Sequence, residues 1–195
     1  MPEQDPQNLT QVLDATEHST EDNDPVRVGD ILGAFSSRLF GPLLIIPGLI
    51  LLTPLGAIPG APAILGILVA FLAAQRLIGL NRPWVPKRLR ERGIEREKLL
   101  RGFEKIRPWT RRVDRVIKPR LTFLTVGRAE YLAVLLALLL GATIPAVGLI
   151  PFAAMLPGAG LAFIGLALTA RDGLLMLAAF GFAAATAYFA TLAVM

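Results

Sequence analysis

Two long apolar blocks, residues 39–80 and 129–195, constrain the fold of this chain more than any other feature. Their charged side chains are few: Arg76, Glu130, Arg171 and Asp172. Hydrophobic residues make up 54% of the chain and charged residues 18%, a balance typical of small integral membrane proteins rather than of soluble domains. The sequence therefore predicts an all-α integral membrane protein, with a single membrane domain over residues 29–195.

The first block predicts a helical hairpin. As helix, its residues would extend over about 63 Å, enough for two passages of a hydrocarbon core about 30 Å thick. Proline removes a backbone donor and clashes with the preceding turn, so a proline-rich stretch does not form one straight helix. We therefore expect a discontinuous or re-entrant first passage and an uninterrupted helix over residues 63–80. The prolines are Pro42, Pro47, Pro54, Pro59 and Pro62.

The second block has room for three passages, because residues 131–195 as helix would extend over about 98 Å. The last of them, residues 173–194, is the most uniformly apolar stretch and predicts a C-terminal transmembrane helix. Ala179, Ala183 and Ala187 recur every four residues, and such small-residue stripes allow helices to approach closely. The stripe indicates either an intramolecular helix contact or the face of a homodimer.

The proline patterns of the two blocks are alike. In each pattern the first and last prolines are twelve positions apart and the run ends in Pro-Gly-Ala, which predicts two Pro/Gly-broken helical repeats; the prolines are Pro47, Pro54 and Pro59, and Pro145, Pro151 and Pro157. In transporters, broken-helix repeats form a midplane site, with helix N-termini directed at an anionic group. The alternative is that the prolines only shape the bundle. Spacing leaves open whether the repeat is inverted or parallel.

A strongly basic segment, residues 81–128, separates the two blocks. It contains sixteen Lys or Arg and five acids, for a net charge of +11, which predicts a cytoplasmic location by the positive-inside rule. Its two amphipathic stretches are typical of helices that lie on a membrane surface. We expect them to bind anionic lipid headgroups, and not nucleic acid, because no base-stacking motif accompanies the charges. The predicted headgroup surface is Arg107, Trp109, Arg111, Arg112 and Arg115.

The N-terminal segment, residues 1–28, is polar and acidic. Residues 1–30 hold eight acids against the single cation Arg27, and they have too few apolar groups to offset the entropy of ordering. The sequence predicts a disordered tail there. A more specific alternative is that this tail docks on the basic segment. Since the segment lacks an apolar core run, it does not resemble a signal peptide.

Catalytic groups are scarce in this sequence. It contains no Cys, its one histidine is His18 in the acidic segment, and no two acids share a transmembrane face. Neither a Ser/His/Asp set nor a glycine-rich phosphate loop is present. We therefore expect a protein that is not an enzyme and that uses no cofactor or metal.

Several motifs together resemble one known family. They are Asn81-Arg82-Pro83-Trp84-Val85-Pro86, then Arg107-Pro108-Trp109-Thr110-Arg111-Arg112, and Arg171-Asp172-Gly173 before the last apolar run. Their order over residues 28–195 resembles the ExoD family of bacterial exopolysaccharide-synthesis proteins. The resemblance implies a multi-pass inner-membrane protein linked to exopolysaccharide production. It implies no biochemical activity and no catalytic residues.

These observations favour a protein that transports or handles an anionic, polyprenyl-phosphate-like lipid. In that interpretation the proline-glycine breaks line the site and two arginines neutralise the phosphate. One alternative is a membrane scaffold that recruits polysaccharide-synthesis proteins through its basic segment, and another is an ion or proton transporter. The candidate anion site comprises Arg76, Arg171, Pro59, Gly60, Pro157 and Gly158.

Overall fold

The computed structural model forms two compact units, one of residues 1–39 and 80–118 and the other of residues 40–79 and 119–195. We call the first the polar unit and the second the bundle. The structure describes residues 10–11, 14, 17, 26–27, 40–80, 83–84, 87, 91, 93–97, 100–102, 104, 107–108, 120–148, 150 and 152–194.

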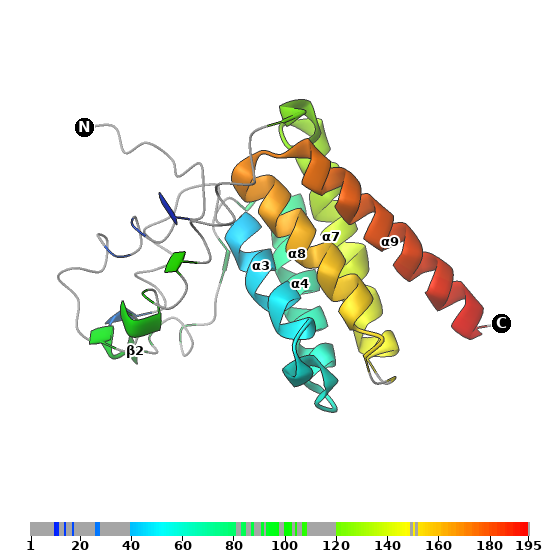
Figure 1. Ribbon diagram of the computed structural model, residues 1–195, viewed down its shortest axis with the longest axis horizontal. Helices are drawn as coiled ribbons and strands as arrows, with labels where there is room; N and C mark the ends of the chain where they lie inside the picture. The colour runs from blue at the N-terminus through cyan, green and yellow to red at the C-terminus, as the bar shows by residue number, and fades with distance from the viewer. Residues whose placement is uncertain are drawn as a thin grey trace. The chain divides into compact units, whose positions relative to one another are not determined.

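Five α-helices make up most of the bundle (Figure 1). The first apolar block forms the hairpin of α3 and α4, and the second forms α7, α8 and α9. Two short 3-10 helices, η1 and η2, lie in the connecting loops. The bounds are α3 Phe40–Leu51, η1 Pro54–Ala57, α4 Ala61–Leu77, η2 Thr122–Leu124, α7 Arg128–Val147, α8 Met155–Ala170 and α9 Gly173–Val194.

Local sequence explains where these helices begin and end. Gly60 precedes α4 at a φ of 88°, a conformation that suits glycine, and Pro62 follows in the first turn, where its missing donor costs nothing. Gly79, at a φ of 93°, closes the other end of α4. Asp172 caps α9, because its Oδ1 accepts the Leu174 N–H at 2.9 Å. The bounds of α9 are those that the apolar run predicts.

The breaks do not fall at every proline. Pro47 lies inside α3 and Pro145 lies inside α7, so both helices continue past the residue expected to interrupt them. The chain instead reverses at the hairpin tips, residues 52–60 and 148–154. Neighbouring helices can compensate for the backbone bond that a proline removes. A re-entrant first passage stays a prediction.

The helices pack in two antiparallel pairs, α3 with α8 and α4 with α7, while α9 packs on α8. Glycines allow both pairs to approach closely. A Cβ at Gly66 would lie 2.7 Å from the Gly141 carbonyl oxygen, and one at Gly41 would lie 2.9 Å from the Gly165 carbonyl oxygen. Side chains at these positions would force the helices apart, so the glycines set the spacing of both pairs.

Large apolar side chains lie both inside and outside the bundle. Leu44, Val69, Ile144 and Leu161 are among the fully buried core residues. Outward-facing ones include Ile46, Ile64, Ile67, Leu132, Leu139, Leu177, Tyr188 and Phe189. Such an extensive apolar exterior is unusual for a soluble monomer and normal for a surface in contact with lipid. Two helices, α7 and α9, are long and apolar enough to cross a membrane, and α3, α4 and α8 are shorter apolar helices.

The two ends of the bundle differ in charge. Both hairpin tips, residues 52–60 and 148–154, lie at one end in Figure 1 and carry no charged residue; we call this the charge-free end. The starts of α3 and α7, the end of α4 and the α8–α9 turn lie at the other, which we call the charged end. Its charged residues are Arg76, Arg120, Arg128, Glu130, Arg171 and Asp172.

In the polar unit, the N-terminal segment pairs with the basic segment. Strand β1 (Val26–Arg27) runs antiparallel to β2 (Gly93–Ile94), with Val26 opposite Ile94, and Val26 is fully buried. Glu97 and Arg101 form the ion pair that their spacing along a helix suggests. Disorder of residues 1–28 stays a prediction. Their described residues include β1 and two carboxylates that contact the basic segment, described below.

Candidate functional site

A large apolar cavity lies at the charge-free end of the bundle, with a volume of about 1220 Å³. Pockets for drug-sized ligands occupy roughly 300–1,000 Å³, so this one has room for a larger molecule. Its walls come from the end of α7, the α7–α8 loop, the start of α8 and the second half of α9. The lining residues are Leu52, Ala146, Val147, Ile150, Phe152, Ala153, Met155, Leu156, Pro157, Ala159, Phe163, Phe182, Thr186, Phe189, Ala190 and Leu192.

The cavity exists because α9 diverges from α8 (Figure 1). Ala179 and Ala183 are buried, whereas Ala187 is exposed. The first two alanines of the predicted stripe thus serve an intramolecular contact, and the third lies beyond it. Phe163 and Phe182 stack at a ring-centroid distance of 5.2 Å and form part of the wall between the two helices. Because the helices then separate, apolar surface of both remains uncovered.

The chemistry of the cavity wall is almost purely hydrocarbon. Thr186 is the one polar side chain among the described lining residues, and its hydroxyl donates to the Phe182 carbonyl oxygen at 2.8 Å. The wall therefore favours an apolar ligand, held by burial of its surface.

The charged end is held together by an ion pair between α4 and α7. Arg76 Nη2 lies 2.6 Å from Glu130 Oε1, and the two side chains are 15% and 31% exposed. Arg76 is in the last turn of α4 and Glu130 is in the first turn of α7. Each charge is therefore opposite in sign to the partial charge of its own helix end, which is a favourable interaction. Arg76 is thus already neutralised by a protein carboxylate.

The α8–α9 turn explains the Arg171-Asp172-Gly173 motif in structural terms. Arg171 adopts a left-handed conformation that ends α8, and Asp172 caps α9. The Gly173 N–H donates to the Arg120 carbonyl oxygen at 2.6 Å, and a Cβ at Gly173 would lie 2.5 Å from the Leu121 carbonyl oxygen. Arg171 is half-buried and makes no ion pair with the part of the chain that the structure describes.

The six residues of the predicted anion site do not come together. Arg76 and Arg171 lie at the charged end, and the two proline-glycine pairs lie at the charge-free end, roughly 20 Å away along α4 or α8. Pro59 and Gly60 are exposed at a hairpin tip. Pro157 lines the cavity, and Gly158 packs against Leu51 of α3.

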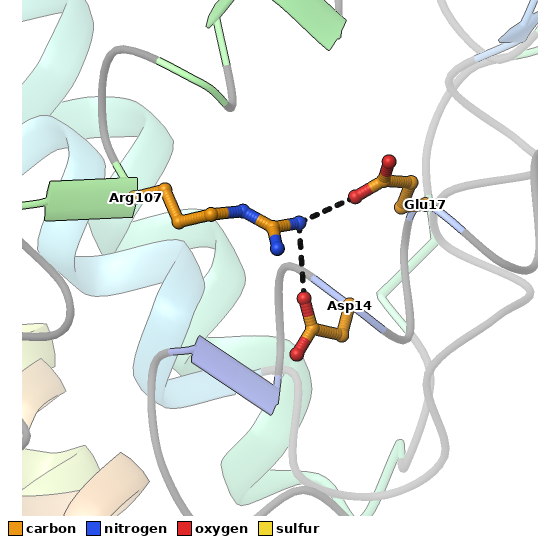
Figure 2. Close-up of polar contacts among 3 residues, drawn as sticks. All are labelled: Asp14, Glu17 and Arg107. Atoms are coloured by element: carbon orange, nitrogen blue, oxygen red, sulfur yellow. Dashed lines mark hydrogen bonds and ion pairs between the residues drawn. The ribbon is translucent and has the colours of Figure 1, made fainter.

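One residue of the predicted headgroup surface, Arg107, is described; Trp109, Arg111, Arg112 and Arg115 lie outside the described residues. Figure 2 shows two carboxylates of the N-terminal segment converging on Arg107 Nη2. The distances are 3.0 Å to Asp14 Oδ1 and 2.6 Å to Glu17 Oε2. The basic segment therefore binds anions at this position, and the anions belong to the same chain.

Family membership follows from sequence comparison. A family model described as "Exopolysaccharide synthesis, ExoD" matches residues 9–192. This chain belongs to the ExoD family. The family prediction from the motifs is therefore confirmed, and the ExoD match extends into the acidic segment, which the motifs alone did not include.

Two relatives from other bacteria are similar to this chain. Protein ExoD of Rhizobium meliloti (strain 1021) is 36% identical over 140 residues, which cover 70% of this chain and 58% of that protein. An uncharacterized protein of Synechocystis sp. is 26% identical over 161 residues, 80% of this chain and 73% of its own length. The match thus spans less than two thirds of the Rhizobium protein. No solved structure matches this ExoD-family chain.

Sequence reasoning missed most of the cavity. Phe163, Phe182 and Phe189 are distant in sequence and read as ordinary membrane-facing residues. Their common wall depends on the angle between α8 and α9, which no local pattern encodes. The nearest signal was the alanine stripe, which predicted a close helix contact, but the stripe continues to Ala187 and so does not mark the point where the two helices separate.

Proposed function

We propose that this chain is a multi-pass protein of the bacterial inner membrane, with its charged end and basic segment in the cytoplasm. The apolar exterior of the bundle and the two long helices support the membrane location. The one-sided distribution of charge supports the orientation, since Lys and Arg accumulate in cytoplasmic loops. In this orientation the cavity lies in the half of the bilayer away from the cytoplasm.

We infer that the α3–α4 and α7–α8 hairpins form a parallel internal repeat. In support, each hairpin's first helix packs on the second helix of the other, and glycines from both helices meet in each contact, Gly41 with Gly165 and Gly141 with Gly66. Both hairpins also point the same way (Figure 1). A parallel arrangement brings the proline-glycine breaks to one end rather than to the middle. This geometry favours lipid binding over a midplane transport site.

The cavity is best suited to the hydrocarbon chain of a lipid. Its wall is apolar, its volume exceeds that of a drug-sized pocket, and it continues the apolar outer surface of α9. Burying a chain there would contribute about 25 cal/mol for each Å² of apolar area removed from water. Exchange with bulk lipid offsets part of that gain, so the shape of the wall would decide which chain is retained.

The distance between the cavity and Arg171 indicates which class of lipid could contact both. From Pro157 in the cavity wall to Arg171 at the charged end, α8 rises by roughly 21 Å. An ordinary acyl chain spans one leaflet, roughly 15 Å of hydrocarbon. A lipid with its phosphate near Arg171 and its chain end in the cavity therefore needs a longer chain, as in polyprenyl phosphates.

This binding mode gives a concrete form to the family description. We propose that the protein acts in exopolysaccharide synthesis by holding a polyprenyl-phosphate-like lipid, and that it is not itself an enzyme. The observation that carries the proposal is the cavity at the charge-free end. Arg171 would contact the phosphate, while Arg76 would remain paired with Glu130.

Native mass spectrometry of the gently purified full-length chain tests this proposal. Ala190→Trp fills the cavity from α9, where Ala190 is half-buried and faces the lining. Ala184→Trp makes the same change on an exposed position of α9 outside the lining. We expect a polyprenyl monophosphate to remain bound to the native chain and to Ala184→Trp, and to be lost from Ala190→Trp. Equal retention by the two variants would contradict a cavity-bound chain.

A second comparison measures the contribution of the phosphate to lipid retention separately from that of the hydrocarbon chain. Polyprenol lacks the phosphate but has the same hydrocarbon chain, so the native protein should retain the monophosphate in preference. Arg171→Ala should reduce that preference about tenfold, the effect of losing one charge-assisted contact of ~1.4 kcal/mol. A preference that survives this substitution would place the phosphate elsewhere.

The scaffold alternative is favoured by one observation, the binding of protein carboxylates by Arg107 in the basic segment. An acidic partner among the polysaccharide-synthesis proteins would bind in the same way. Reversing the basic charges of residues 87–115 should abolish recruitment of such a partner while leaving lipid retention in the cavity intact. Recruitment that survives this charge reversal would contradict the scaffold function.

A further inference from the structure

An ionic contact joins two segments that are far apart in the chain. Asp14 and Glu17 contact Arg107, and Glu17 precedes Arg107 by ninety residues in the sequence. The acids are three positions apart, which places them on one face of a helical turn. In Figure 2 both carboxylates approach the same guanidinium nitrogen, Nη2, from different directions. The site therefore gathers two negative charges around one positive charge.

The acidic segment also has an attachment that does not depend on charge. Strand β1 pairs with β2 through backbone hydrogen bonds, and Val26 is buried there. Loss of the Arg107 contact would therefore release the Asp14 and Glu17 carboxylates from Arg107 without detaching β1 from β2. The arrangement combines a fixed anchor with an exchangeable ionic contact.

The ionic contact is of a kind that another anion can replace. All three side chains are partly exposed, 31% for Arg107, 44% for Asp14 and 40% for Glu17. Partly exposed ion pairs contribute little net stability and weaken as salt increases. A phosphate offers a guanidinium several acceptor oxygens on one group, and arginine is well matched to bind it through two parallel hydrogen bonds.

The basic segment that contains Arg107 is joined to the bundle at both of its ends. Residues 81–128 join the end of α4 to the start of α7, so both ends of the basic segment are attached to the charged end of the bundle. An anionic leaflet would attract its net positive charge. We propose that Arg107 is a binding site for the phosphate of an anionic membrane lipid, and that Asp14 and Glu17 occupy this site when such lipids are scarce. This inference does not rest on the lipid cavity, which lies at the other end of the bundle.

The test uses the full-length chain in nanodiscs and a spin label on the acidic segment. Because the sequence contains no cysteine, Gln11→Cys provides a single labelling position, and this labelled protein is the reference. In nanodiscs of neutral phosphatidylcholine we expect a largely immobile label. Replacing part of that lipid with anionic phosphatidylglycerol should shift the ratio of mobile to immobile label by about fivefold, the effect of one basic side chain near an anionic surface.

Variants in the labelled background assign the effect to the contact. Asp14→Asn with Glu17→Gln should give a mobile label in both lipid mixtures, because neither of these two side chains then forms an ion pair with Arg107. Glu91→Gln with Glu104→Gln removes the same charge from exposed positions of the polar unit and should behave like the reference. Arg107→Gln should leave the label mobile throughout, whereas Arg107→Lys should keep a weaker lipid response.

Three outcomes would overturn the proposal. The first is label mobility that does not change with phosphatidylglycerol, and the second is a full lipid response in Arg107→Gln. The third concerns the source of the phosphate. If inorganic phosphate releases the segment in neutral nanodiscs as fully as phosphatidylglycerol does, at an ionic strength matched with chloride, the ligand is a soluble anion and not a lipid.

Discussion

The two ends of the bundle are built from the same five helices but are closed in different ways. At the charged end, the Arg76–Glu130 ion pair joins α4 to α7, and Asp172 and Gly173 fix the α8–α9 turn against Arg120 and Leu121. At the charge-free end, α9 diverges from α8 and leaves a cavity of about 1220 Å³. An ion pair and a helix cap therefore help to close one end, whereas the described residues at the other end carry no charge and leave a cavity lined by apolar side chains.

The predicted anion site combined two roles, neutralising a phosphate and lining a ligand site, and the structure places the residues for these roles at different ends of the bundle. Charged groups that hold helices together are already satisfied by protein partners, so they are poorly placed to bind a ligand. An apolar wall that lacks partners can bind a ligand but cannot recognise a charge. A lipid with a phosphate and a long chain can combine the two ends without bringing them together.

The largest expected effect is a difference in thiol labelling between the two ends of the bundle. We expect this difference to be all-or-none. In the proposed topology, Ile58→Cys at a hairpin tip should react in intact cells with a membrane-impermeant maleimide. Thr122→Cys at the charged end should react only after the inner membrane is permeabilised. Because the native chain has no cysteine, each variant carries a single reactive thiol. Labelling of Thr122→Cys in intact cells would reverse the assignment of the two ends.

The next prediction tests whether glycine contacts set the spacing between α4 and α7. Gly66→Leu should destabilise the bundle by about 1–3 kcal/mol or more, because even a Cβ at this position would meet Gly141 and Ile144 of α7. Gly181→Leu on α9 is the matched control, since nothing lies within 4 Å of a Cβ there. Thermal unfolding in the same detergent compares them. Equal unfolding temperatures would mean that α4 and α7 do not pack at Gly66.

A smaller effect is expected from the ion pair at the charged end. Glu130→Gln leaves Arg76, whose side chain is 15% exposed, without its carboxylate and should cost about 1–2 kcal/mol. Arg76→Gln should cost less, because Glu130 is more exposed and lies at a helix N-terminus that favours negative charge. A double-mutant cycle by thermal unfolding measures their coupling. A coupling energy of zero would show that the pair does not join α4 to α7.

Much of the fold could be predicted from local sequence. The apolar run of residues 173–194 gives the bounds of α9, because a uniform run of that length with no charge has few alternatives in a membrane. Glu97 and Arg101 are four residues apart, a spacing that favours an ion pair on one helix face, and they form that pair. In contrast, Pro47 and Pro145 were poor guides to helix ends, since the effect of a proline depends on the helices around it.

The candidate site was less predictable. Arg76 could be recognised as exceptional because it is charged within an apolar block, but its partner Glu130 is fifty-four residues away in sequence. The cavity wall combines residues from Leu52 to Leu192, and its shape depends on where α8 and α9 separate. Both features are set by tertiary packing, and a periodic pattern in one segment contains no information about it.

The most direct test of the account is cross-linking with two photoactivatable polyprenyl phosphates, one labelled at the chain end and the other beside the phosphate. After irradiation of the full-length protein in nanodiscs, peptide mass spectrometry locates each cross-link. We predict that the chain-end label attaches to the cavity wall, within residues 146–163 or 182–192, and that the other label attaches near Arg171 or within residues 120–130. Attachment of both labels at the same end of the bundle would contradict the account.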